Sequence, residues 1–235
     1  RQDKGDTPYN LRNCAYLAEF DKEKIVFQEI VQESTFYYDI KKFICADTAR
    51  IITGNNLKYL ISIFNSKLFF YGMKTYYCGG KLGEKGIRMK HTFMQNFPIV
   101  ELSDKNQKVY IDIVNEISEL SETLKINRDR LYRRLTDNFD NIKISKKLEL
   151  FERLDFKLFV KELNKQKIKL SLIQQDEWEE YFKINRDKCI NLKIEISKLD
   201  NIMDKMIYKL YKLTYDEVLI IDNDFSFSKI EYDKI

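Results

Sequence analysis

Cationic, aromatic and glycine residues gather between Tyr76 and Lys90 of this 235-residue chain, where the sequence is YYCGGKLGEKGIRMK. Four of the chain's seven glycines lie within residues 79–86. Residues 41–100 hold ten Lys or Arg against two acids, whereas the whole chain has a formal net charge of only +4. Glycines let a backbone approach a ligand closely, and cations displace the counterions condensed on a phosphate backbone. These residues therefore suit contact with phosphate groups.

Side chains outside the Gly-rich loop add groups that can hydrogen-bond base edges, among them Glu29, Gln32 and Asn65. Tyrosines beside the loop suit stacking on a base or holding a phosphate, and they suit a place in the core equally well. An ordinary solvated basic face is the alternative for the cations. The candidate nucleic-acid contacts are Gln28, Arg50, Lys74, Tyr76, Tyr77, Lys81, Lys85, Arg88, Lys90 and His91.

No pattern in the sequence predicts an active site. Asp6-Thr7-Pro8-Tyr9 lacks the first proline of the D/N-P-P-Y motif that holds a flipped base, and no Gly-rich strand-turn-helix for a nucleotide cofactor accompanies it. Asp155 and Lys157 imitate half of a metal-dependent nuclease site, but no Pro-Asp partner precedes them. His91, the only histidine, lies in a basic run and suits a phosphate contact at least as well as a general base. We expect no catalytic residue and no cofactor in this chain.

The sequence predicts no membrane-spanning segment, because no apolar run approaches the length needed to span a bilayer. The four cysteines are far apart and include no C-x-x-C pair, so a zinc site is not expected and reduced thiols are the default. No signal pattern is present at the start, and we expect a cytoplasmic location. Because the chain starts with Arg1, we expect it to be a piece of a longer polypeptide.

The first domain, expected over residues 1–102, must position the candidate contacts. Residues 1–100 hold all seven glycines and both prolines. Apolar spacing predicts a helix from Leu57 to about Gly72. β-branched and aromatic runs predict the extended segments, namely 24–31, 34–38, 43–53 and a closing strand over 99–102. The expected fold class is α+β, with a mixed domain followed by an all-helical domain.

The second domain, expected over residues 103–235, contains no Gly and no Pro, which favours helices. Heptad-spaced apolar residues over 113–135 and 192–213 predict an antiparallel coiled-coil-like pair, with Asn127 fixing its register. The net charge of residues 101–235 is −1, from 26 cations and 27 acids, so this half is expected to be a scaffold.

Shorter elements are also expected in the helical half. The segment between the two heptad-spaced stretches is expected to form amphipathic helices over 148–163 and 172–182. Capping boxes are expected at Ser171 and Thr214. The residues from Asp222 onward are expected to be a polar tail or a late edge strand.

The order of several segments resembles one known family, the TaqI-like C-terminal specificity domain of type IIG restriction-modification enzymes and adenine-specific DNA methyltransferases. Type I specificity subunits are distant relatives of that domain. Residues 199–218 are similar to the helical end of those polypeptides. The segments that carry the resemblance are KIVFQEI at 24–30, ADT at 46–48, IITG at 51–54, LKYLISIFNSKLFF at 57–70, the Gly-rich loop and FPI at 97–99.

The resemblance implies recognition of a specific sequence in double-stranded DNA, with residues 76–90 facing the DNA and Asn65-Ser66 supporting the recognition platform. In that family an upstream domain binds S-adenosylmethionine, supplies the N-P-P-Y motif and flips the adenine, and many members add a nuclease. The resemblance therefore implies a separate methyltransferase domain or subunit as partner, with this chain as a C-terminal fragment or a separate specificity subunit. The helical half would be a spacer or docking surface.

Three other functions remain open from the sequence. The first is a coiled-coil adaptor that binds a protein partner while the basic loop is incidental, which a steep salt dependence of DNA binding would argue against. The second is a small hydrolase or nuclease, which would require metal-dependent activity of the isolated chain. The third is RNA binding, which competition between duplex DNA and single-stranded RNA would separate from DNA binding.

Overall fold

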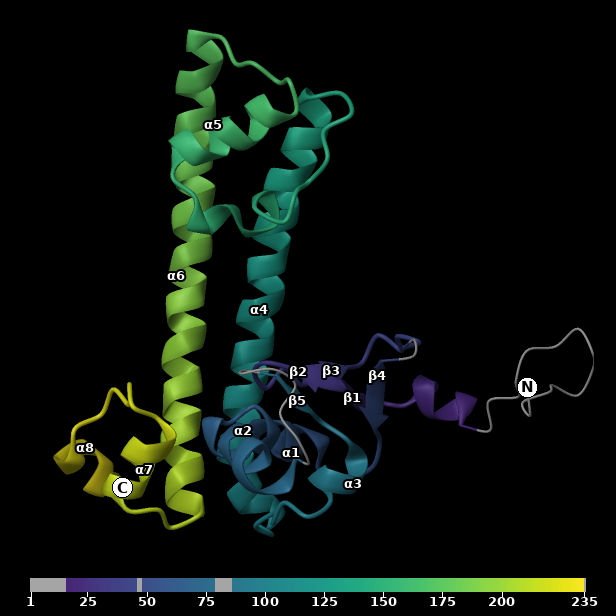
Figure 1. The fold of residues 1–235 in the computed structure, drawn as a ribbon, viewed down its shortest axis with the longest axis vertical. Coiled ribbons are helices and arrows are strands. Elements are labelled where there is room, and N and C mark those ends of the chain that lie inside the picture. The colour runs from purple at the N-terminus through teal and green to yellow at the C-terminus, as the bar shows by residue number, and fades with distance from the viewer. Residues whose placement is uncertain (1–15, 46–47, 79–85, 235) are drawn as a thin grey trace, which may run out of the picture. The chain divides into compact units, whose positions relative to one another are not determined.

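The computed structural model describes residues 16–45, 48–78 and 86–234 (Figure 1). Its contacts divide the chain into two compact units. Unit 1 comprises residues 1–114 and 203–235, and unit 2 comprises residues 115–202. Each unit is therefore described by itself. The expected α+β fold class is confirmed, and the strands within the described ranges all belong to unit 1.

Unit 1 contains two small antiparallel sheets, one in the order β3-β1-β4 and one that pairs β2 with β5. Ile25 of β1 pairs with Tyr38 of β3 on one side and with Ile52 of β4 on the other. The extended segment expected over 24–31 is thus divided between the two sheets. The strands are β1 (Lys24–Gln28), β2 (Ile30–Val31), β3 (Tyr37–Asp39), β4 (Ala49–Ile52) and β5 (Ile87–Arg88).

Unit 1 also contains helices, and two of them continue into unit 2. These two are α4 (Asp104–Asn138) and α6 (Leu172–Leu210). Among the described residues, no helix has the length and apolar character needed to cross a membrane. The other helical segments of unit 1 are η1 (Leu17–Asp21), α1 (Leu57–Phe64), α2 (Lys67–Gly72), η2 (Met73–Tyr77), α3 (His91–Met94), α7 (Tyr215–Ile221) and α8 (Lys229–Asp233).

The prediction of one continuous helix from Leu57 to about Gly72 is wrong. The segment forms two helices, α1 and α2, separated at Asn65-Ser66. Ser66 is extended, and its hydroxyl accepts a hydrogen bond from the Phe69 backbone N–H at 3.1 Å, which starts α2. The Asn65 amide donates to the Phe36 carbonyl and accepts from the Phe36 N–H. Asn65-Ser66 therefore supports the neighbouring backbone, as the resemblance implied.

The closing strand expected over 99–102 is also wrong, since this segment has no strand partner. Tyrosine hydroxyls take up carbonyl groups of the segment in place of a strand partner. The Tyr59 hydroxyl donates to the Val100 carbonyl at 2.7 Å, and the Tyr211 hydroxyl donates to the Pro98 carbonyl at 2.7 Å. The segment is apolar enough for a strand, but Tyr59 of α1 and Tyr211, directly after α6, hold it and the preceding Pro98.

A buried ion pair lies within the first sheet of unit 1. Lys24 Nζ is 2.5 Å from Asp39 Oδ2, and both side chains are fully buried. The Asp39 carboxylate also accepts hydrogen bonds from the backbone N–H groups of Lys41 and Phe43. Burial alone would raise the pKa of Asp39, but the hydrogen bonds from Lys24 and the backbone outweigh it and hold that pKa below its ordinary value. The pair fixes the chain direction after β3.

Unit 2 contains the rest of α4 and α6, together with η3 (Leu148–Arg153) and α5 (Phe156–Lys165). The helix expected over 148–163 is wrong as one element, because Leu150 is non-helical and Asp155 starts a new helix. The Asp155 carboxylate accepts a hydrogen bond from the Leu158 N–H at 2.7 Å, so its role is helix capping. The helix expected over 172–182 extends to residue 210, since no Gly or Pro interrupts it.

Within unit 2, α4 and α6 run antiparallel and share one buried cluster, in which Leu131 and Leu135 are fully buried. Phe139, directly after α4, contacts Trp178 near the start of α6 at a ring distance of 5.4 Å. Leu124, earlier in α4, packs in the same cluster as Ile196, later in α6. Asn127, expected to fix the register, donates its amide to the Thr123 carbonyl of its own helix.

The capping boxes expected at Ser171 and Thr214 are present. The residues after Asp222 are not a polar tail or an edge strand, because a further capping box at Ser228 starts the short helix α8. Lys67 at the start of α2 connects to this end of the chain within unit 1. Its Nζ lies 2.7 Å from Asp222 Oδ2, and its backbone N–H donates to Asp204.

Candidate nucleic-acid interface

Glu29 occupies the junction between the two sheets of unit 1. It follows the last residue of β1, Gln28, which is exposed and pairs with Ala49 of β4. The Glu29 backbone N–H donates to the Thr48 carbonyl at 3.0 Å, beside β4. Its carbonyl accepts from the Met89 N–H at 2.6 Å, directly after β5. The backbone of one residue thus holds both sheets together.

The Glu29 carboxylate lies between two of the candidate contacts, Arg50 and Arg88. Arg50 Nη2 on β4 is 2.5 Å from Glu29 Oε2, and Arg88 Nε on β5 is 3.5 Å from Glu29 Oε1. The Glu29 side chain is only 16% exposed, whereas those of Arg50 and Arg88 are 49% and 43% exposed. A mostly buried carboxylate therefore holds the Arg50 guanidinium by a hydrogen bond and lies within ion-pair distance of Arg88, while solvent still reaches both guanidinium groups. Such planar forks suit two-point hydrogen bonding to phosphate or to a guanine edge.

Cys78 connects the Arg88 strand to the preceding helical segment, η2. The Cys78 thiol donates to the Arg88 carbonyl at 3.3 Å, and the Cys78 N–H donates to the Met73 carbonyl at 2.7 Å. Burial raises the pKa of the Cys78 thiol, so the thiol stays protonated and able to donate at neutral pH. Lys74 and Tyr76 on η2 are exposed and are joined to β5 through this bond.

The two tyrosines of η2 have different environments. Tyr76 is 73% exposed and contacts only the Tyr71 ring among the aromatic neighbours described, at 6.3 Å. Tyr77 is half-buried against the buried Phe97, with ring centroids 5.9 Å apart. Phe97 also packs so closely on Gly72 that a Cβ there would lie 2.9 Å from its ring. Tyr77 is therefore a packing residue in this structure, and Tyr76 is open to a ligand.

The remaining candidates lie beside this region or outside the described residues. Lys90 is half-buried and precedes α3, and His91 is the exposed first residue of α3. Lys81 and Lys85 lie outside the described residues. The structure thus places Gln28 next to the Arg50–Glu29–Arg88 cluster and connects Lys74 and Tyr76 to it through Cys78.

Two protein-family models match parts of the chain. Residues 6–99 match the TaqI-like C-terminal specificity domain. Domains of this family recognise DNA sequences in restriction-modification enzymes, and the match supports that role for this part of the chain. Residues 103–207 match a domain of unknown function (DUF8810). No curated protein and no solved structure matches the chain.

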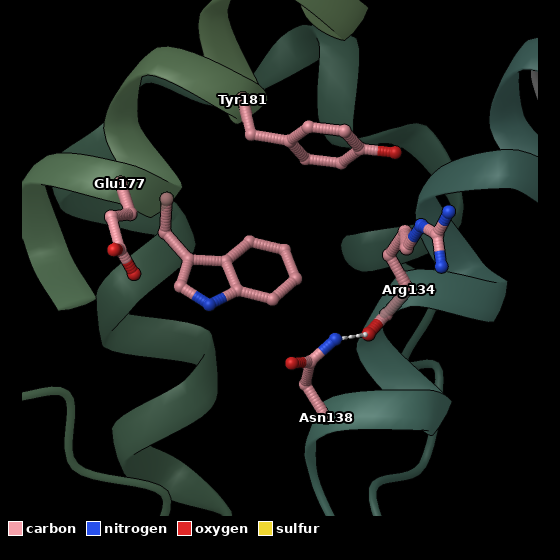
Figure 2. A pocket seen from close by; sticks show the side chains of 5 residues that line it. Arg134, Asn138, Glu177 and Tyr181 are labelled. Carbon is pink, nitrogen blue, oxygen red and sulfur yellow. Dashed lines mark hydrogen bonds between the residues drawn. The ribbon is translucent and has the colours of Figure 1, made fainter.

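A pocket of unit 2 lies between α4 and α6 and has charges of both signs in its lining. One cavity of about 200 Å³ has the Arg134 guanidinium and the Glu177 carboxylate on opposite sides (Figure 2). Opposed charges suit neither a phosphate nor a cation, and the Asn138 amide is already donated to the Arg134 carbonyl. Among the described residues, no group of three His, Cys, Asp or Glu could hold a metal ion.

Sequence reasoning missed the role of Glu29. It appeared only among the side chains with groups for base edges, whereas in the structure its carboxylate hydrogen-bonds Arg50 and pairs with Arg88. Its partners are 21 and 59 positions away in the sequence, and both contacts depend on strand pairings that no local pattern specifies. The nearest local signal is that Glu29 is the single acid in the otherwise uncharged run 25–32.

Proposed function

We propose that this chain recognises a specific sequence in double-stranded DNA through the part of the specificity domain that carries Arg50 and Arg88. The observation that carries the proposal is the shared carboxylate of Glu29. A flexible cation can follow any phosphate, but a guanidinium held by a carboxylate presents its donors in one direction. Direction is what the reading of a base edge requires.

Charge supports the same proposal. Glu29 neutralises part of the positive charge of the two arginines, which would be a disadvantage for a surface selected only for affinity to phosphates. The Glu29 charge thus weakens the attraction of this surface for phosphates but favours one direction for the guanidinium donors. Lys74, exposed on η2, and Lys90 remain available for phosphate contacts that set the position of the domain on the duplex.

In this proposal the chain positions a separate methyltransferase domain or subunit, so that an adenine in the recognised sequence can be extruded into that partner's pocket. The partner would hold the S-adenosylmethionine, since the expected Gly-rich cofactor motif is absent from this sequence. Part of the helical half would contact the partner.

The test is the enrichment of duplexes from a random-sequence pool by the full chain and by Glu29→Gln. Wild type should enrich a defined motif. Glu29→Gln removes the negative charge while keeping the side-chain length, so binding to the unselected pool should be equal or tighter. Enrichment of the motif should fall by about tenfold or more, because each well-oriented base contact contributes roughly 1–3 kcal/mol of discrimination.

Glu33→Gln is the matched control. Glu33 is exposed, lies four residues away in the same unit and has the same charge. It should leave the enrichment unchanged. If Glu29→Gln enriched the same motif as strongly as wild type, the oriented arginines would not read the sequence and the proposal would fail.

A further inference from the structure

Unit 2 contains a second concentration of positive charge. It is not visible in the net charge of residues 101–235, which is close to zero. Residues 125–169 hold 14 Lys or Arg against 7 Asp or Glu, a net charge of +7. The adjoining residues 115–124 hold three acids and no cation, and residues 170–202 hold seven acids against five cations. Cations placed only for solubility would be interspersed with acids. The charges of unit 2 are instead separated.

Three of the seven acids within this basic segment make structural contacts. Glu152 is buried and paired with Arg128 and Lys193. Glu162, with 9% of its side chain exposed, lies 2.6 Å from Lys165 Nζ and 3.9 Å from Lys147 Nζ. Asp155 caps α5 through its carboxylate. These three acids are therefore engaged in structural contacts, while Asp129, Asp137, Asp140 and Glu149 are exposed beside the cations.

Ten cations of the segment are exposed and have no ion-pair partner among the described residues. We name them the unit 2 basic surface. Its members come from the end of α4, from η3 and α5, and from the loops between them. They are Lys125, Arg130, Arg133, Lys143, Lys146, Arg153, Lys157, Lys161, Lys167 and Lys169.

The fold brings two parts of this surface together. The Lys143 backbone exchanges two hydrogen bonds with the Gln166 side chain, at 2.8 Å and 3.0 Å. The Ser145 hydroxyl lies 3.5 Å from Glu162 Oε2. The loop after α4 is thus fixed against the end of α5, so Lys143 and Lys146 are held near Lys161 although they lie 15 or more positions away in the sequence. Like charges are gathered here without neutralisation.

We propose that the unit 2 basic surface binds the phosphate backbone of duplex DNA, as a second contact separate from the specificity domain. Concentrated, unpaired and exposed cations are the feature that a polyanion selects, because each phosphate contact releases a condensed counterion. The choice of duplex DNA among polyanions rests on the proposed function of the specificity domain. The surface adds affinity but no sequence preference, since flexible lysines meet phosphates alike.

The test uses the full chain with Lys143→Gln, Lys146→Gln and Lys161→Gln combined, and measures affinity for a random duplex over a range of salt concentrations. The slope of log K against log[salt] should become shallower by about 2–3, and affinity near 0.15 M salt should fall by tenfold or more. The motif enriched by wild type should stay the same, because the specificity domain is unchanged.

Lys183→Gln, Lys188→Gln and Lys198→Gln combined are the matched control. These lysines are exposed on α6 in the same unit and lose the same total charge. The control should change the affinity less than threefold. Equal loss in both variants would show a general charge effect, and no loss in either would show that DNA does not touch the surface. Either result overturns this inference.

Failure of this inference and failure of the proposed function are distinguishable. A motif that is enriched without any effect of the Lys143, Lys146 and Lys161 replacements would remove only the second contact. Salt-dependent binding that depends on these lysines, without any enriched motif, would remove only sequence recognition. If single-stranded RNA displaced the duplex at equal nucleotide concentration, the assignment of the surface to duplex DNA would be overturned.

Discussion

Two basic regions of this protein differ in how their cations are held. Residues 41–100 and residues 125–169 have similar net charges, +8 and +7. In the first region Glu29 hydrogen-bonds Arg50 and lies within ion-pair distance of Arg88, while in the second ten cations extend into solvent without ion-pair partners among the described residues. The difference teaches that charge alone does not indicate what a basic surface does. A fixed guanidinium can discriminate between base edges, whereas a free ammonium contributes mainly attraction.

The largest expected effect comes from Asp39→Ala, which tests how far the first region depends on its buried framework. The substitution leaves Lys24 charged and buried without its partner, so unit 1 should lose about 3–5 kcal/mol of unfolding free energy. Hydrogen exchange at the β1 amides measures this loss. Trp178, the only tryptophan, belongs to unit 2, so its fluorescence reports that unit during denaturation.

Asp21→Ala removes the same charge from an exposed position and is the control for Asp39→Ala. It should leave the β1 amides protected. If the Trp178 transition shifted as much as the β1 exchange, the two units would unfold as one and could not be compared separately.

Tyr77→Ala and Tyr76→Ala separate packing from exposure within the first region. Tyr77→Ala removes a ring that packs on Phe97 and should lower the unfolding free energy by about 1–3 kcal/mol. Tyr76→Ala should change it by less than about 0.5 kcal/mol, since the ring is mostly exposed. Only Tyr76→Ala should weaken DNA binding without lowering stability, as measured by chemical denaturation and duplex titration together.

Arg88→Lys sharpens the distinction between fixed and free cations because it keeps the charge and removes the fork. It should cost about 1–3 kcal/mol of discrimination at one position of the recognised sequence, with little change in affinity for random duplex. Lys74→Gln should do the reverse: it weakens binding to all sequences alike and makes the salt slope shallower by about 1. Identical binding profiles for the two variants would contradict the comparison.

The smallest expected effect is on pH dependence, and it concerns the buried carboxylates of the two units. Burial opposes ionisation of Asp39 and Glu152, but hydrogen bonds from Lys24 and Arg128 hold both pKa values below the ordinary 3.8 and 4.5. A lowered folded-state pKa contributes stability above the unfolded pKa, and that stability is lost as pH falls through the folded value. Stability should therefore be flat near neutrality and decline below about pH 4, as followed by acid titration of each unit. Asp39→Asn should make that decline shallower in unit 1 and leave it unchanged in unit 2, since Glu19, Glu217 and Glu231 of unit 1 also have lowered pKa values.

The sequence predicted what depends on local patterns. The capping boxes at Ser171 and Thr214 satisfy backbone groups within three residues, and their sequence signature is confirmed. Missing Gly and Pro correctly indicated long helices, although they could not show that residues 172–182 and 192–210 form one helix. The break at Asn65-Ser66 could not be predicted from the apolar spacing, because that spacing continues across it.

Other features depend on residues distant in the chain and could not be read locally. Residues 99–102 resemble a strand, but the hydroxyls of Tyr59 and Tyr211 hold this segment. The bridging role of Glu29 requires two strand pairings to be known. The charge of unit 2 was available in the sequence and was lost through averaging over residues 101–235. A shorter window would have found residues 125–169.

The buried cluster of unit 1 is built from two parts of the chain that are synthesised at different times. Met203 and Ile207 pack in the same buried cluster as Tyr110 and Val114, yet the whole of unit 2 is synthesised between these two pairs. At 5–20 residues per second, the N-terminal part of unit 1 waits roughly 4–18 s for the helix that covers it. During that interval an apolar face stays open on the nascent chain. Synthesis of unit 1 therefore begins before that of unit 2 and is completed after it.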